Sequence, residues 1–149
     1  MILKTLLDGS AEKYCSKCDH VFFDAPSPAV IIGVIEDHRI LLTRSVGWEH
    51  PYWGLVAGHI RTGESAEETV VREVREEVGL EIFDLKILGT YARNPDLLMI
   101  GFVAKTRYDK IEKSQELEKA SWFSIDEELP LRPNSIASQV VEKIRSRRK

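Results

Sequence analysis

Residues 58–80 read GHIRTGESAEETVVREVREEVGL, and this stretch decides the fold because it predicts one helix together with both of its ends. Ser65 followed three residues later by Glu68 has the pattern of a capping box, which marks a helix N-terminus. Gly79 is typical of the residue that stops a helix. Four valines recur between these signals at helical spacing and predict one apolar face: Val70, Val71, Val74 and Val78.

Three acids, Glu73, Glu76 and Glu77, lie beside that apolar face on about one helical turn. Carboxylates about 5 Å apart repel by roughly 3 kcal/mol at an effective dielectric near 20, so a partly buried group needs a cation or must take up protons. Mg²⁺ and Mn²⁺ prefer oxygen ligands and share them with phosphates. The pattern therefore indicates a phosphate-processing metal site. The alternative is a solvated helix surface with pairs such as Glu68 and Arg72.

Apolar, β-branched runs around this helix predict a mixed sheet. The expected strands are residues 29–35, 40–44, 53–58, 86–92, 97–105 and 120–124, and the first two form a hairpin. The stretch NSIASQVVEKIRSRR predicts a terminal amphipathic helix whose inward residues are Ile136, Val140, Val141 and Ile144. Residues 1–28 are expected to form a short irregular arm, and residues 29–149 the main domain. The fold class is therefore α+β, with a mixed sheet between helices.

Composition limits the classes of function. The chain has 149 residues and a formal net charge of -3, which does not favour a general nucleic-acid binder. It has no apolar run of the roughly 18 residues that a membrane span needs, and its start lacks a cleavage pattern, so we expect a cytoplasmic protein. Cys15 and Cys18 are too close for an ordinary structural disulfide, which suits a reducing compartment.

The spacing of Gly58, Glu64 and the run from Arg72 to Leu80 matches the Nudix box, G-x5-E-x7-R-E-U-x-E-E-x-G-U, in full. The sequence therefore resembles the Nudix hydrolase family. This resemblance implies an α/β/α sandwich and hydrolysis of a nucleoside diphosphate linked to another moiety, with Mg²⁺ or Mn²⁺ as cofactor. The intact box argues against a related sensor that binds nucleotides without hydrolysis.

The resemblance also implies residue roles. Metal ligands are expected at Glu73 and Glu77, at Glu76 directly or through water, and at the carbonyl of Ala57. Arg72 should orient the glutamates, and Glu64 should support the metal site from the loop. Gly58 and Gly63 should let that loop turn tightly beside the substrate phosphates. Catalysis uses a carboxylate that takes a proton from the attacking water, and the resemblance leaves open which glutamate this is.

A narrower resemblance links the chain to NADH pyrophosphatases. ELEKASWF, residues 116–123, is similar to their E-[IL]-x-x-A-x-W-F segment, which makes Glu116 a further candidate for the base or a metal ligand. TYARNPDLL replaces their S-Q-P-W-P-F-P-x-S signature, so the preference for reduced nicotinamide is open. Expected substrates are NADH, NAD or ADP-ribose, with nucleoside triphosphates or NAD-capped RNA as alternatives.

Two other segments leave alternatives open. Cys15 and Cys18, with His20 nearby, resemble half of a zinc ribbon, but a structural zinc needs four ligands, so they are either a zinc site or two free thiols. Trp48 and Tyr52 either stack on a nucleobase or prop their own loop. His59 either touches substrate or is structural. The expected partners are a small nucleotide and a second copy in a homodimer, with no membrane, and with nucleic acid only as a capped RNA end.

Overall fold

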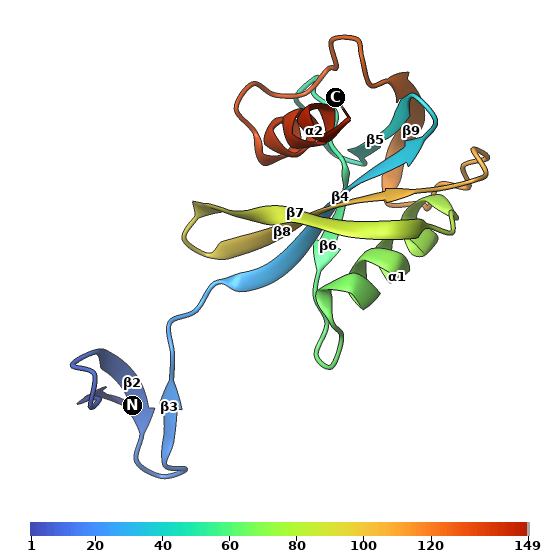
Figure 1. Ribbon diagram of the computed structural model, residues 1–149. Helices are drawn as coiled ribbons and strands as arrows, with labels where there is room; N and C mark the ends of the chain where they lie inside the picture. Colours follow the sequence, from blue (N-terminus) through green and yellow to red (C-terminus); the bar gives the residue numbers. More distant parts are fainter. Residues whose placement is uncertain (149) are drawn as a thin grey trace.

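Two apolar clusters lie on opposite faces of one mixed sheet, and each is covered by one helix. The computed structural model describes residues 1–148. Helix α1 (Ala66–Val78) packs on one face and helix α2 (Ile136–Arg147) on the other, as Figure 1 shows. This arrangement confirms the predicted sandwich of a mixed sheet between helices. Neither helix has the length and apolar character that a membrane crossing needs, within the residues described.

Strand β4 (Ser27–Glu36) lies at the centre and shows why both faces are apolar. Successive side chains of a strand point to opposite faces. Val30, Ile32 and Val34 therefore join the cluster under α1. Ile31 and Ile35 join the cluster under α2. A strand buried on both sides reads as the continuous apolar run that the sequence shows.

The sheet combines parallel and antiparallel pairs. Its order is β7-β8-β4-β5-β9, and β6 also pairs with β4. The bounds are β5 Arg39–Ser45, β6 Val56–His59, β7 Phe83–Asn94, β8 Leu97–Lys105 and β9 Leu117–Ser124. Strands β4 and β8 are parallel, and the other pairs are antiparallel. The expected hairpin of β4 and β5 is confirmed.

One expected strand, residues 53–58, is displaced. Trp53 and Gly54 make only isolated bridges, to Leu131 and Thr43, and regular pairing begins at Val56 in β6. The chain here leaves β5, to which Gly54 is bonded, and joins β4. The first part of this apolar run therefore pairs with β5 and the rest pairs with β4, and the sequence alone does not reveal this change of partner.

The expectation of an irregular N-terminal arm is wrong. Strands β1 (Ile2–Thr5), β2 (Ala11–Cys15) and β3 (His20–Phe22) form an antiparallel meander. Gly9 with φ 88° and Asp19 with φ 52° lie in its two turns, where the backbone is left-handed. These strands are short and largely exposed, so they lack the apolar signal of a core strand. In Figure 1 this unit lies apart from the main sheet at the end of an extended connection.

Helix α1 begins and ends where the sequence indicates. The N–H of Glu68 donates to Ser65 Oγ at 3.1 Å, and the N–H of Ser65 donates to Glu68 Oε1 at 3.1 Å, which confirms the capping box. Gly79 is left-handed, with φ 70°. The apolar face differs in one position, because Thr69 is fully buried whereas Val71 is only half-buried.

Candidate active site

A cleft of about 520 Å³ opens beside α1, and we call it the acidic cleft. Its lining residues are Arg61, Glu73, Glu76, Glu77, Ser114, Gln115 and Glu116. They come from the loop before α1, from α1 itself and from the segment that leads into β9. The structure thus brings Glu116 to the three acids of the helix, although nearly forty residues of sequence lie between them.

Backbone hydrogen bonds attach the segment before β9 to the end of α1. Ser114 N–H donates to the Glu77 carbonyl at 2.8 Å, and Glu112 N–H donates to the Val78 carbonyl at 2.9 Å. The last carbonyls of a helix have no partner within the helix, so this segment also caps α1. Val46 N–H donates to the Glu116 carbonyl at 2.9 Å. Glu116 is therefore held between the helix end and the loop after β5.

Glu77 carries the strongest electrostatic signal of the cleft. Burial, together with the negative charges of Glu73, Glu116 and Glu76, raises the pKa of this half-buried carboxyl to about 8. Without a cation, Glu77 therefore keeps its proton at neutral pH. Removing that proton leaves negative charge that only a positively charged group can balance.

Arg72 organises the acids from one side. Its Nε and Nη2 donate to the two Glu64 oxygens at 2.7 and 2.9 Å. Its Nη1 donates to Glu73 Oε1 at 2.9 Å and to Glu76 Oε2 at 3.2 Å. Its Nη2 also donates to the His59 carbonyl at 3.3 Å. Only 16% of the Arg72 side chain is exposed, so this position is the one expected for a residue that orients the glutamates.

Glu64 binds Arg72 and does not take part in lining the acidic cleft. The hydrogen bond from Arg72 holds the pKa of Glu64 down at about 2. Thr69 Oγ1 and the N–H of Arg61 also donate to Glu64 Oε1, each at 3.0 Å. Glu64 does not line the acidic cleft. This geometry fits the supporting role that the family resemblance implies for Glu64.

The two glycines of the loop are needed for different reasons. Gly63 has φ 85°, so it lies in the left-handed turn that glycine favours. Gly58 lies in β6 without a left-handed backbone, and a Cβ there would overlap the Glu73 side chain. The expected reason for Gly58, a tight turn, is therefore wrong. Its missing side chain makes room for the Glu73 carboxylate, next to Ala57 in the same strand.

The donors of the acidic cleft suit a hard divalent cation, because they are carboxylate oxygens with excess negative charge. Among residues 1–148, no three His, Cys, Asp or Glu side chains converge in a finished ligand cluster. The hydrogen bonds from Arg72 to Glu73 and Glu76 explain this arrangement.

A buried arginine that sequence reasoning missed fixes the aromatic loop, residues 46–52. The Arg44 guanidinium donates to the carbonyls of Tyr52, His50 and Trp48 at 2.6, 2.8 and 3.1 Å. The Trp48 ring packs against His50 and over Gly54. These contacts are those of the loop-propping alternative. The one available signal was a cation at the end of an apolar strand, in ILLTR.

The remaining candidates lie at the edge of the site or away from it. His59 is exposed at the end of β6. His50, which lies in the aromatic loop between Trp48 and Tyr52, is not a candidate, because its Nδ1 accepts the N–H of Tyr52 at 3.2 Å. Cys15 and Cys18 lie in the N-terminal meander, and hydrogen bonds from Cys18 and Lys17 lower the pKa of Cys15.

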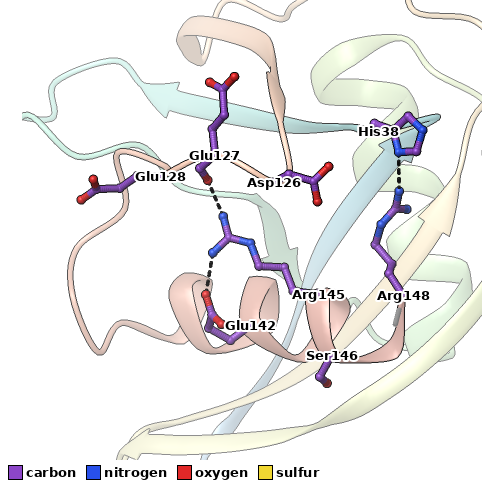
Figure 2. Close-up of a pocket in the computed structure, with 8 residues that line it drawn as sticks. All are labelled: His38, Asp126, Glu127, Glu128, Glu142, Arg145, Ser146 and Arg148. Carbon is purple, nitrogen blue, oxygen red and sulfur yellow. Dashed lines mark hydrogen bonds and ion pairs between the residues drawn. The ribbon is translucent and has the colours of Figure 1, made fainter.

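A second and larger cavity, about 660 Å³, lies at the C-terminal end of α2. Figure 2 shows that both arginines of this cavity have partners within it: Arg145 bonds Glu142 and the Glu127 carbonyl, and Arg148 bonds His38. None of the expected site residues line this cavity. Its volume therefore does not make it the better candidate for chemistry.

Comparison with known proteins supports the resemblance to the Nudix family. The sequence model of the NUDIX domain family matches residues 25–144. A relative from Pseudomonas aeruginosa, named NAD-capped RNA hydrolase NudC, is 36% identical over 137 residues, which cover 90% of this chain and 49% of the relative. The chain thus spans about half the length of the curated relatives it matches.

Solved structures show the same fold. A NUDIX hydrolase from Nitrosomonas europaea has a TM-score of 0.67 at 24% identity, over 83% of this chain and 91% of that one. The NUDIX domain of Shewanella oneidensis NrtR, solved with ADP ribose, has a TM-score of 0.68 at 22% identity, over 91% and 94% of the two chains.

Proposed function

The chain belongs to the Nudix family, and we propose that it hydrolyses the diphosphate bond of a nucleoside diphosphate derivative with the help of a divalent cation. One observation carries this proposal. Glu77 is half-buried among Glu73, Glu76 and Glu116 in an open cleft, with its pKa raised to about 8. A cluster built only for stability has no reason to gather three further acids around a half-buried carboxyl.

In this proposal, Glu73 and Glu77 would hold the cation, Mg²⁺ or Mn²⁺, together with Glu76, Glu116 and the Ala57 carbonyl. When bound, the cation neutralises diphosphate oxygens and makes water more acidic. Arg72 keeps the carboxylates oriented in the free protein. A glutamate takes the proton of the attacking water. Glu116 is a candidate for this base, and it is the one candidate that lies outside α1.

We place the substrate in the NAD class because of the sequence relationship to the Pseudomonas aeruginosa protein named NAD-capped RNA hydrolase NudC. NADH, NAD, ADP-ribose and the NAD-capped end of RNA all contain the required diphosphate. The aromatic loop begins at Val46, whose N–H donates to the Glu116 carbonyl, and we propose Trp48 and Tyr52 of this loop as the residues that stack on the nucleobase. Gly58 and His59 border the same site, and a homodimer is the proposed assembly.

A substrate panel tests the proposal. Purified protein is incubated with NADH, NAD, ADP-ribose, ATP and NAD-capped RNA, with Mg²⁺ or with EDTA, and nucleotide products are separated by chromatography. We expect Mg²⁺-dependent release of a nucleoside monophosphate from at least one NAD-class substrate. Tight binding without turnover of any substrate would instead indicate a nucleotide sensor and refute the hydrolase.

A further inference from the structure

Arg61 is the one basic side chain among the residues that line the acidic cleft. It is 64% exposed, and its nearest charged partner is Glu76, whose Oε1 lies 3.9 Å from Arg61 Nη1. That distance is too long for a hydrogen bond. The planar fork of Arg61 therefore faces the cleft with its donors unused by the described residues.

Other arginines around the site are committed to fixed partners. Arg72 bonds three carboxylates and a carbonyl. Arg44 bonds three carbonyls of the aromatic loop. Arg75, on the same helix, donates Nε and Nη2 to the two Glu81 oxygens at 2.7 and 2.8 Å. Arg61 thus differs from them in being available to a ligand.

The backbone of Arg61 is nevertheless held in place. Its N–H donates to Glu64 Oε1 at 3.0 Å, and its carbonyl accepts the N–H of Glu64 at 3.0 Å. Glu64 is held in turn by Arg72. Because the backbone of Arg61 is already held in place, binding a ligand needs only the side chain to become ordered and not the loop, which suits a substrate clamp.

We propose that Arg61 binds a phosphate group of the substrate's diphosphate inside the acidic cleft. This inference rests on the proposed function. The four carboxylates of the cleft repel a diphosphate, and a cation shared among them offsets only part of that repulsion. A guanidinium adds two parallel charge-assisted hydrogen bonds to phosphate oxygens, a geometry that lysine does not reproduce. Arg61 leaves its weak contact with Glu76 when the phosphate arrives.

Binding of ADP to the Mg²⁺-loaded protein, measured by calorimetry, tests the inference without relying on turnover. Arg61→Gln should raise the Kd for ADP about 10- to 100-fold, the loss expected for hydrogen bonds to a charged group. Arg61→Lys should recover part of that affinity. Steady-state assays with NADH should show a raised KM for both variants. The matched control is Arg75→Gln, which removes the same charge from the same region outside the cleft and should stay within twofold of wild type.

The outcomes separate the two proposals. Wild-type protein that hydrolyses a substrate, together with an Arg61→Gln variant of unchanged ADP affinity, overturns the role of Arg61 alone. An equal loss in Arg75→Gln also overturns it, because the effect would then be general electrostatics. Wild-type protein that neither binds ADP nor hydrolyses any substrate overturns both.

Discussion

At the scale of single residues, the Glu73 carboxylate occupies space that a Cβ at position 58 would need. We expect Gly58→Ala to displace Glu73 and to lower kcat by about 10- to 100-fold, since misplacement of a catalytic group by about 1 Å has a cost of this size. Overpacking should also lower the free energy of unfolding by about 1–3 kcal/mol. Steady-state kinetics and urea denaturation measure the two effects.

Gly9→Ala is the control for that experiment. Gly9 has φ 88° and open space around its α-carbon, so alanine there adds backbone strain without any collision. It should cost about 1–2 kcal/mol of stability and leave kcat unchanged. A Gly58→Ala enzyme with wild-type kcat would show that Glu73 is not where the reaction needs it.

Glu77 is the residue on which the proposed chemistry depends most. Glu77→Gln keeps the shape of the side chain and removes its negative charge, so we expect kcat to fall about a thousandfold through loss of cation binding. Glu67→Gln, an exposed change on the same helix, should leave kcat unaltered. Parallel titration with Mg²⁺ should show weaker cation affinity only in the first variant. A Glu77→Gln variant of near-normal rate would contradict the site assignment.

At the scale of elements, the aromatic loop depends on Arg44 more than on its own sequence. We expect Arg44→Met to destabilise the fold by about 2–4 kcal/mol, because three loop carbonyls lose a charged donor. KM should rise as the loop loosens. Arg39→Met is the control, since the Arg39 side chain is 40% exposed and its ion pairs with Glu36 and Asp109 should be worth less than about 1 kcal/mol each. Equal losses in urea denaturation would refute the special role of Arg44.

The helices and strands that could be predicted are those whose position is determined by a local sequence signal. The capping box, the stop at Gly79 and the apolar run of β4 require no knowledge of neighbours. The bend at Gly54 and the Arg44 contacts depend on which strands lie alongside, so the sequence did not reveal them. The meander of residues 2–22 depends on turns rather than on an apolar face, and this explains why it was expected to be irregular.

The candidate site follows the same division. The helix periodicity predicted that Glu73, Glu76 and Glu77 lie together. Glu116 was named only through family resemblance, because its arrival depends on hydrogen bonds from the segment 112–116 to the end of α1. The free guanidinium of Arg61 was not predicted at all, since a sequence does not show which arginines have partners.

At the scale of the whole molecule, two carboxyls with opposite pKa shifts set how stability depends on pH. Glu64 has a folded pKa of about 2, below its ordinary value of 4.5, so it stabilises the fold above pH 4.5 and this contribution is lost as the pH falls toward 2. Glu77 has a folded pKa of about 8, above its ordinary value of 4.5. The folded protein keeps this proton when the unfolded chain releases it, so stability is lost as the pH rises from 4.5 through 8.

We therefore expect the metal-free protein to be most stable in mildly acidic buffer and to lose about 5 °C of Tm between pH 5 and pH 8.5 in EDTA. Calorimetric scans across this range measure it. Glu77→Gln should flatten the alkaline side, because glutamine has no proton to lose, and Glu67→Gln should not. Mg²⁺ should restore wild-type Tm at pH 8.5 by binding the ionised cleft. An alkaline fall that persists in Glu77→Gln would place its origin outside the acidic cleft.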